Sequence, residues 1–536
     1  MYELKWKIKL TDGKSFSGTE KVEGGPVRVV CDLPVGEIQS VRATMRYDLD
    51  PEDRIFVNGF QSWTNCPERG PQDSIRSLRH LPQLGVRKFG LERYGDYYFE
   101  NYPEKPGYFH GESWAYARRG EEYRLLASLD ETNGYTLIRY DCGTGKLRLK
   151  RDCRGLRSGE GFHAFDLYFQ KGTEQEVFDG WFAAMGVKPR TTEPLCGYSS
   201  WYNRYQKIDE DCILSDLEAC GEFLQPGDLF QIDDGWEPKV GDWLRADSIK
   251  FPWGMAPLVK RIHQMGLKAG LWLAPFVCQK GSNIYVNHPD WLLQVEKEPW
   301  YCGANWGGFY SLDIDNPEVQ EYLRRVFRRV LEDWDFDLVK LDFLYGAAPM
   351  GYYSETRAGR MIRAMDFLRE LCGDKLILGC GVPLLPAFGR VDYCRIGCDV
   401  GLDWDGNWLM RRIHRERVST RQSLENTVFR RQLNGRAFLN DPDVFFLRSE
   451  NLSLDPEQKR TLAEVNTLLG GVWLTSDDMG SYDEQQAADY RALRHLREAE
   501  DIRVTVGDRI RIDYRLDGEP RYLTADLAPV KKRRKR

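Results

Sequence analysis

The first 190 residues contain many short runs in which apolar and polar side chains alternate. Examples are 27–33, 40–49, 123–130, 135–141 and 162–169. A period of two is typical of strands that bury one face, and Gly, Pro and Asp separate these runs. Residues 1–190 are therefore predicted to form an antiparallel β-sandwich. A helical pattern at 174–186 is predicted to lead out of this domain.

After residue 190 the pattern changes to short apolar runs that alternate with longer stretches of helical period. The predicted strands are 195–201, 229–236, 267–276, 336–343, 375–381, 392–400, 436–443 and 471–478. Eight strands with helical connections fit a (β/α)₈ barrel, with a doubly wound open sheet as the rival. The barrel is favoured because polar residues end nearly every strand, and not only those at one switch point. The connection between the fifth and sixth strands is too short for a full helix.

The predicted fold class is therefore α/β, with a TIM barrel at 191–480 between the sandwich at 1–190 and a small C-terminal β-domain at 481–536. Within this last part, 491–502 has a helical pattern and the following residues alternate. The chain ends in six consecutive cations. We interpret them as a solvated tail, with a nucleic-acid or nuclear-targeting role as the alternative.

Composition excludes several classes of protein. The 536 residues include 76 Lys and Arg against 82 Asp and Glu, so a net charge of −6 leaves no overall basic field for nucleic acid or an anionic membrane. No apolar run reaches the ~18 residues that span a bilayer, and the N-terminus lacks the apolar core of a signal peptide. The 13 cysteines include no CxxC pair, which indicates reduced thiols in a cytoplasmic protein. Only 7 histidines are present and no HExxH or HxH occurs, so we expect no His-based metal site, and we expect no cofactor.

Aspartates follow five of the predicted barrel strands, where a barrel carries its chemistry. They are Asp233 and Asp234, Asp342, Asp399, Asp441 and Asp443, and Asp477 and Asp478. A single Asp at such a place is often a helix cap. A ring of carboxylates with so few histidines favours acid/base or nucleophilic oxygen chemistry, or a hard-cation site.

Two strand ends predict a pair of carboxyls with different roles. Lys340 lies two residues before Asp342 on the same strand face, and its ammonium is expected to lower the pKa of Asp342 and keep it ionised, as a nucleophile needs. The charge of Asp342 is in turn expected to favour the protonated form of Asp399, as a general acid needs. Arg395, four residues before Asp399, is expected to bind a substrate hydroxyl. Structural ion pairs are the alternative in both cases, while an acid and nucleophile pair is typical of glycoside hydrolysis.

The DDGW segment at 233–236 also suits sugar binding. Asp233 and Asp234 can accept hydrogen bonds from neighbouring hydroxyls, and Trp236 can form an apolar wall. A capping turn remains the alternative for this motif.

Residues 195–480 resemble glycoside hydrolase family 36, the melibiase-type α-galactosidases. The resemblance rests on the segments SSWYNRYQKIDEDC, LFQIDDGW, NHPDWLL, VKLDF, RIGCDV and NDPD in the expected order. It implies a retaining, metal-free hydrolase whose barrel lies between two β-domains. By motif, Asp342 resembles the nucleophile and Asp399 the acid/base. Asp233, Asp234 and Trp236 resemble the group that binds galactose near O4 and O6, Lys340 the lysine beside the nucleophile, and Arg395 a residue near the acid/base.

Some positions depart from the family pattern. The CSGGG-like segment after strand five is CGVPL here, so Cys380 is kept but bulkier residues follow it. Because this strand end is expected to face the sugar's 2-position, galactose and N-acetylgalactosamine both remain open. Trp63, in the GFQSWT loop, and Trp201 are each expected either to form a substrate wall or to pack internally. The aspartates of 440–443 and 475–478 are expected to support other groups more often than to touch substrate.

The expected function is an exo-acting α-galactosidase that acts on oligosaccharides, with no nucleic-acid or membrane partner and with homo-oligomers allowed. The alternatives are an α-N-acetylgalactosaminidase, a galactosyl transferase like the plant raffinose synthases, a hard-cation barrel enzyme, and a non-catalytic sugar-binding relative. The last is disfavoured because both Asp342 and Asp399 are present.

Overall fold

The N-terminal part of the computed structural model consists of two antiparallel sheets. The structure describes residues 2–79, 81–93, 95, 103–153, 156–350 and 355–528. The first sheet has the order β2-β1-β4-β10-β9-β6, with β11 added beside β4, and the second has the order β3-β12-β8-β7-β5. The strands of the first sheet are Tyr2–Leu10 (β1), Ser15–Val22 (β2), Gly36–Arg46 (β4), Tyr108–Glu112 (β6), Thr136–Asp141 (β9), Lys146–Arg151 (β10) and Arg157–Ser158 (β11). Those of the second are Gly25–Cys31 (β3), Arg54–Val57 (β5), Trp114–Arg119 (β7), Glu122–Ser128 (β8) and Phe162–Gly172 (β12).

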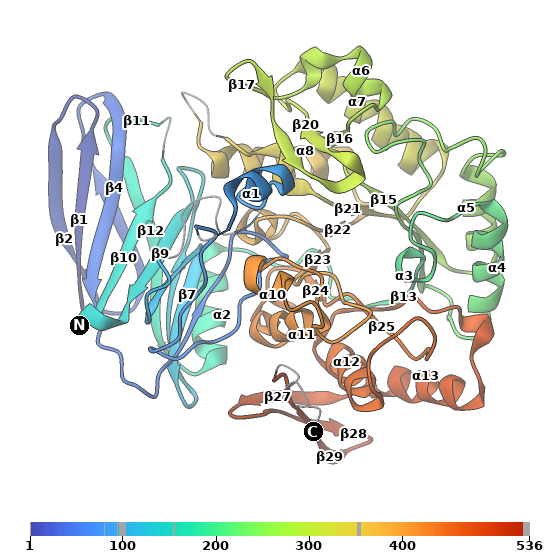
Figure 1. Ribbon diagram of the computed structural model, residues 1–536. Helices are drawn as coiled ribbons and strands as arrows, with labels where there is room; N and C mark the ends of the chain where they lie inside the picture. Colours follow the sequence, from blue (N-terminus) through green and yellow to red (C-terminus); the bar gives the residue numbers. More distant parts are fainter. Residues whose placement is uncertain are drawn as a thin grey trace.

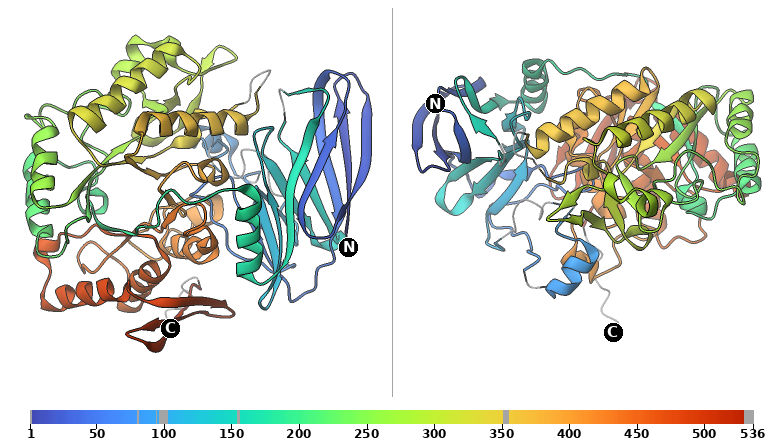
Figure 2. Two further views of the ribbon diagram at one scale, coloured as in Figure 1. Left: turned by 180° about the vertical axis from the view of Figure 1, so that it is seen from behind. Right: turned by 90° about the horizontal axis from the view of Figure 1, so that it is seen from above.

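Helix α2, Glu174–Met185, leads from the sandwich to the parallel sheet, as the helical pattern at 174–186 predicts. Thr173 and Glu176 form a capping box at its start. The helix packs on β8 and β12 and lies between the sandwich and the rest of the chain (Figures 1 and 2). A shorter helix, α1 at Gln83–Phe89, belongs to the connection between β5 and β6.

All eight strands predicted after residue 190 are present and lie in one parallel sheet. They are β13 (Leu195–Ser199), β14 (Leu229–Ile232), β15 (Lys268–Leu273), β21 (Leu338–Leu341), β22 (Leu376–Gly379), β23 (Tyr393–Arg395), β24 (Leu439–Asp441) with β25 (Val444–Phe445), and β26 (Val472–Thr475). The sheet order is β24-β23-β22-β21-β15-β14-β13-β26-β25. Its first and last members, β24 and β25, are separated by only two residues of the chain, so the sheet curls round until its ends meet. The result is TIM-barrel-like.

The longer helices between these strands lie on the outside of the curled sheet (Figure 1). They are α4 (Glu210–Cys220), α5 (Ala256–Gln264), α7 (Pro317–Arg328), α8 (Arg357–Cys372), α11 (Thr420–Phe429) and α12 (Pro456–Leu469). The short helices are α3 (Trp201–Arg204), α9 (Leu384–Ala387) and α10 (Met410–Ile413). The four residues of α9 confirm that the link between the fifth and sixth strands is too short for a full helix.

An insertion after β15 was not expected from the sequence. It contains a three-stranded antiparallel sheet of β16 (Val277–Gln279), β19 (Tyr301–Gly303) and β20 (Phe309–Ser311), the short helix α6 (Asn283–Asn287), and the hairpin β17 (Gln294–Val295) and β18 (Glu298–Pro299).

The C-terminal part is a helix and a small sheet. Helix α13 spans Glu484–Leu496 and so begins earlier than the predicted 491–502. Strands β27 (Glu500–Val506), β28 (Ile510–Leu516) and β29 (Glu519–Ala525) form an antiparallel sheet. The cationic tail at 531–536 lies outside the described residues. Among those that are described, no helix combines the length and apolar character needed to cross a membrane.

A loop of the sandwich is anchored on the barrel-like part. The buried guanidinium of Arg430 donates to the carbonyl oxygens of Ser62 and Ile396, at 2.6 and 2.8 Å, and to Asn58 Oδ1 at 2.8 Å. The amide of Cys66 donates to Asn426 Oδ1 at 2.8 Å. These bonds hold the GFQSWT loop, residues 59–64, against the carboxyl-terminal ends of the parallel strands.

Candidate active site

A cavity of about 600 Å³ opens at the carboxyl-terminal ends of the parallel strands. Seven of the ten site residues predicted from the sequence line it: Trp63, Trp201, Asp233, Asp234, Lys340, Asp342 and Asp399. Trp236, Cys380 and Arg395 do not. Further lining residues include Gln206, Trp272, Asn305, Trp306, Phe343, Tyr345, Asn407, His414 and Arg417. The carboxylates therefore meet at one mouth, as their positions after successive strands predict.

Asp342 follows β21 and is held through both oxygens. Its Oδ1 accepts the amide N–H of Phe343 at 2.8 Å, and its Oδ2 accepts the indole N–H of Trp272 at 3.2 Å. Phe343 has φ of 53°, in the left-handed region that a bulky residue rarely adopts, which indicates that the surrounding structure imposes this turn. The pKa of Asp342 is raised, first by burial and then by the charge of Asp399, against the lowering effects of Lys340 and of hydrogen bonds.

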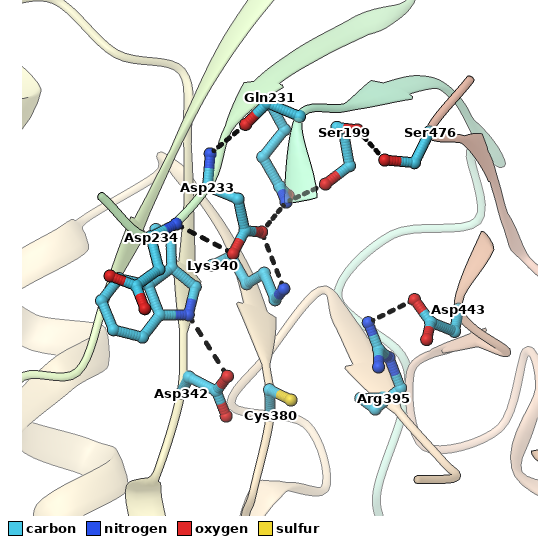
Figure 3. A network of polar contacts seen from close by, with 12 residues as sticks. Ser199, Gln231, Asp233, Asp234, Lys340, Asp342, Cys380, Arg395, Asp443 and Ser476 are labelled. Atoms are coloured by element: carbon cyan, nitrogen blue, oxygen red, sulfur yellow. Dashed lines mark hydrogen bonds and ion pairs between the residues drawn. The ribbon is translucent and has the colours of Figure 1, made fainter. Parts of the chain in front are cut away.

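The prediction for Lys340 and the pKa of Asp342 is wrong in its net direction. Lys340 does face the cavity, but its Nζ donates to Asp233 Oδ2 at 2.8 Å (Figure 3). Asp233 follows β14, two strands from the β21 strand of Lys340. The effect of Lys340 on the pKa of Asp342 is weaker than the loss of hydration there. Burial alone would lower the pKa of Lys340, yet the charge of Asp233 holds it above the ordinary value.

Asp233 and Asp234 follow β14 and differ in their partners. Asp233 accepts from Lys340, from Gln231 Nε2 at 2.7 Å and from the amide of Asp234 at 2.9 Å. Asp234 Oδ2 accepts from Gln206 Nε2 at 2.8 Å and from the indole N–H of Trp306 at 3.0 Å. Asp233 is thus engaged mainly by the protein, whereas Asp234 presents a carboxylate between an amide and an aromatic ring.

Asp399 lies four residues after the end of β23, and its side chain is 41% exposed, so solvent can reach it. Arg395 Nη1 donates to Asp399 Oδ1 at 2.9 Å. The same guanidinium pairs with Asp441 Oδ2 and with Asp443 Oδ1, each at 2.9 Å. Arg395 is therefore surrounded by three carboxylates and does not reach the cavity. The expectation that it binds a substrate hydroxyl is not supported, because Arg395 does not line the cavity and each of its three nitrogens pairs with a carboxylate of the protein.

Trp63 closes one side of the cavity. Its indole N–H donates to Cys380 Sγ at 3.3 Å, and its ring lies 5.1 Å from that of Phe343. Cys380 is buried under this ring, so it supports the wall and does not line the cavity. The backbone also packs closely here, because a Cβ added at Gly381 would lie 2.8 Å from the Trp63 ring.

Trp236 is not the apolar wall that the DDGW motif predicts. It is 0% exposed, and its indole N–H donates to the carbonyl of Trp272 at 2.9 Å. Trp243 lies in the same buried cluster, with its ring 5.9 Å from that of Trp236. Trp272 and Trp306 provide aromatic surface in the cavity instead. Trp272 could have been found from its place on β15, where it is in register with Lys340, whereas Trp306 comes from the unexpected insertion.

The other strand-end carboxylates have protein partners. Asp477 accepts the amide N–H groups of Leu447 and Arg448 and the hydroxyl of Tyr482. Asp478 caps the turn that follows β26. In the described ranges, no group of three His, Cys, Asp or Glu side chains is arranged to hold a metal ion.

The comparisons with known proteins agree on one family. A family model described as Melibiase matches residues 198–362. The α-galactosidase of Escherichia coli is 29% identical over 183 residues, which are 32% of this chain and 25% of that protein. α-Galactosidase 1 of Pediococcus pentosaceus is 33% identical over 122 residues, which are 22% of this chain and 16% of that protein. The matched part thus spans a quarter or less of these curated relatives.

Solved structures match over nearly the whole chain. The α-galactosidase of Thermus thermophilus in complex with p-nitrophenyl α-D-galactopyranoside is 29% identical with a TM-score of 0.76, covering 98% of this chain and 99% of that one. The AgaA α-galactosidase of Geobacillus stearothermophilus is 14% identical with a TM-score of 0.61, covering 96% of this chain and 79% of that one, and shows the fold alone. The family model, the curated relatives and these structures together make the chain similar to the melibiase-type α-galactosidases of glycoside hydrolase family 36.

Proposed function

We propose that the protein is a retaining, exo-acting α-galactosidase that removes terminal α-linked galactose from oligosaccharides. The observation that carries the proposal is that Asp342 and Asp399 line one cavity together with Asp233 and Asp234. The similar Thermus thermophilus enzyme has been solved with an α-galactoside and with stachyose. Asp342 acts as nucleophile and Asp399 as acid/base.

The reaction proceeds in two displacements. An oxygen of Asp342 attacks C1 of the galactose ring while Asp399 gives its proton to the leaving oxygen, so the glycosidic bond breaks and a glycosyl ester forms. Asp399 then takes a proton from water, and the water oxygen attacks C1. The ester bond breaks, Asp342 regains its carboxylate, and the product keeps the α-configuration.

The contacts of Asp342 suit this role. Oδ1 is tied to the Phe343 amide and Oδ2 to the Trp272 indole, so the carboxylate cannot rotate freely. A preoriented nucleophile lowers the entropic part of the barrier. These two donors also stabilise the carboxylate when it is released from the ester in the second step.

Galactose is favoured over N-acetylgalactosamine as the glycone. If the end of β22 faces the sugar's 2-position, as the family resemblance implies, Trp63 stands beside that position and is held there by its contact with the buried Cys380. Their contact leaves little space for an acetamido group, whereas a hydroxyl would fit. We assign Asp233 and Asp234 to hydroxyls on the O4 and O6 side, as the family resemblance implies. Their position in the cavity lining, with Trp201 as a further wall, supports this assignment.

Replacement of the nucleophile tests the proposal. Asp342→Ala is expected to abolish hydrolysis of p-nitrophenyl α-galactoside, and added azide is expected to restore turnover with the inverted β-galactosyl azide as product. Azide should leave wild-type turnover unchanged. Wild-type rates from Asp342→Ala without azide would refute the proposal.

We further propose the division of the chain into a sandwich at 1–190, a (β/α)₈ barrel at 191–480 and a C-terminal β-domain at 481–536. The sheet orders and the curled parallel sheet support it.

A cytoplasmic location is supported by the 13 cysteines, which all carry free thiols.

A further inference from the structure

Glu237 is a buried carboxyl beside the cavity that the proposed reaction does not use. It directly follows the DDGW segment, and only 6% of the residue is exposed. Its Oε2 accepts the amide N–H of Gly235 at 3.2 Å, and its carboxyl is hydrogen-bonded to that of Asp234. Asp234 lines the cavity and Glu237 does not. The two carboxyls are therefore in contact, and only that of Asp234 borders the cavity.

A hydrogen bond between two carboxyls requires a proton on one of them. Asp234 already accepts from Gln206 and Trp306 through Oδ2. Its Oδ1 is buried, and among the described residues no N–H or hydroxyl donates to it. The remaining donor available to Asp234 from the protein is thus the acid proton of Glu237.

The nearby ammonium groups do not neutralise this pair. Lys340 donates to Asp233, and Lys250 donates to the carbonyl oxygens of Gln206 and Gly235. Two adjacent carboxylates cannot both ionise without a large cost. Burial, and then the charge of Asp234, raises the pKa of Glu237 well above its ordinary value. Glu237 is therefore the partner that keeps the proton.

We propose that Glu237 is a positioning residue whose protonated carboxyl donates to Asp234 and holds that carboxylate in place to accept a hydroxyl of the donor sugar. The role rests on the proposed function, because it acts through a sugar-binding carboxylate. Under this proposal the site contains a carboxylic acid, Glu237, that must be protonated for its role.

The proposal predicts how substrate binding depends on pH. Below the pKa of Glu237 the acid proton is present and Asp234 is held. As pH rises through that pKa, the proton is lost, the two carboxylates repel each other, and KM rises. The effect of Glu237 is recognised by a larger change in KM than in kcat.

Two substitutions test the role. Glu237→Gln retains a donor, since its amide N–H can replace the acid proton, but it cannot ionise. We expect its KM for p-nitrophenyl α-galactoside to stay near the wild-type value at acidic pH and to lose the rise at alkaline pH. Glu237→Leu removes the donor, and KM is expected to increase about tenfold or more, as for the loss of a hydrogen bond to a charged group, with a smaller change in kcat.

Glu464→Gln is the matched control. Glu464 is also a carboxyl whose pKa is raised by burial, but it lies on α12 away from the cavity. This variant should keep the wild-type profile. If Glu237→Leu fails to fold, the profile of Glu237→Gln decides the question.

The results separate the two ideas. Three results would overturn the role of Glu237. The first is an alkaline rise of KM that is the same in Glu237→Gln as in the wild type. The others are a wild-type KM that does not depend on pH and an unchanged KM in a folded Glu237→Leu. An absence of wild-type turnover of any α-galactoside would refute the proposed function, and the role of Glu237 with it.

Discussion

Replacement of Arg395 by Met should destabilise the protein more than any surface substitution. The guanidinium donates at 2.9 Å to the carboxylates of Asp399, Asp441 and Asp443. Met occupies a similar volume but removes the charge and all of these donors. Asp441 and Asp443 are buried, so they would remain as carboxylates without the cation that pairs with them.

The cost follows from the burial of the two inner carboxylates. Breaking a buried ion pair by removal of one partner costs about 3–5 kcal/mol of folding free energy, because an uncompensated charge is left inside. The third carboxylate, Asp399, is partly exposed and adds less than about 1 kcal/mol. We therefore expect Arg395→Met to lower the free energy of unfolding by about 3–5 kcal/mol at neutral pH.

The loss should depend on pH in a defined direction. Burial and the neighbouring aspartates already raise the pKa of Asp443 to about 6, although Arg395 lowers it. Since this folded-state pKa lies above that of the unfolded chain, Asp443 favours unfolding increasingly as pH rises to that value. Without Arg395 the pKa rises further. The difference in free energy of unfolding between the wild type and Arg395→Met should therefore be smaller at acidic pH, where Asp443 is protonated, and larger towards neutral pH.

Unfolding in urea, followed by tryptophan fluorescence at several pH values, measures this difference. Arg46→Met is the control, because Arg46 and Asp48 are 86% and 79% exposed and their pair contributes less than about 1 kcal/mol. The double variant Arg395→Met/Asp443→Asn should recover part of the loss. Equal unfolding free energies for Arg395→Met and Arg46→Met would refute the reasoning.

Two further predictions concern the reaction and its specificity. Asp399→Asn should lower kcat/KM for melibiose by about 10²–10⁴-fold, the usual loss for a general acid, and should lower it much less for p-nitrophenyl α-galactoside, whose leaving group needs no proton; equal losses would contradict the role. Trp63→Ala should reduce the preference for p-nitrophenyl α-galactoside over the N-acetylgalactosaminide by about tenfold or more because it opens the wall beside Cys380. Trp253→Ala, at a residue that is 77% exposed, is the control. An unchanged preference in Trp63→Ala would show that the wall lies elsewhere.

The strand pattern and the aspartates that follow it could be predicted from the sequence. Each predicted strand after residue 190 is present, and because the strands are parallel, Asp233, Asp342 and Asp399 meet at one mouth. These features depend on local periodicity and on a topology that places all carboxyl ends together. They do not depend on the details of packing.

The partners of each side chain could not be predicted in the same way. Strand alternation correctly placed Lys340 on the face of Asp342, but the carboxylate that Lys340 bonds is Asp233, which follows β14, two strands away across β15. Arg395 faced Asp399 as expected, and two further aspartates from another strand end took its remaining donors. Such choices depend on the distances between strands, which one sequence does not contain.

The residues that the sequence analysis missed have a similar explanation. Trp306 belongs to a segment with weak periodicity, and only the folded hairpins bring it to Asp234. Glu237 follows the DDGW motif immediately, so its position in the sequence was visible. Its carboxyl is informative only once it is known to be buried against another carboxyl.

The 59–64 loop of the sandwich forms part of the pocket, and this limits which domains can be exchanged between related proteins. A chimera that joins this barrel to a relative's sandwich would lose its own Trp63 and the carbonyl of Ser62 that Arg430 binds. The relative's sandwich must therefore supply a tryptophan at the position of Trp63 and a carbonyl oxygen that can accept from Arg430. Without them, one side of the sugar would be exposed to water. Inheritance of specificity in such chimeras should follow the donor of the sandwich as well as the donor of the barrel.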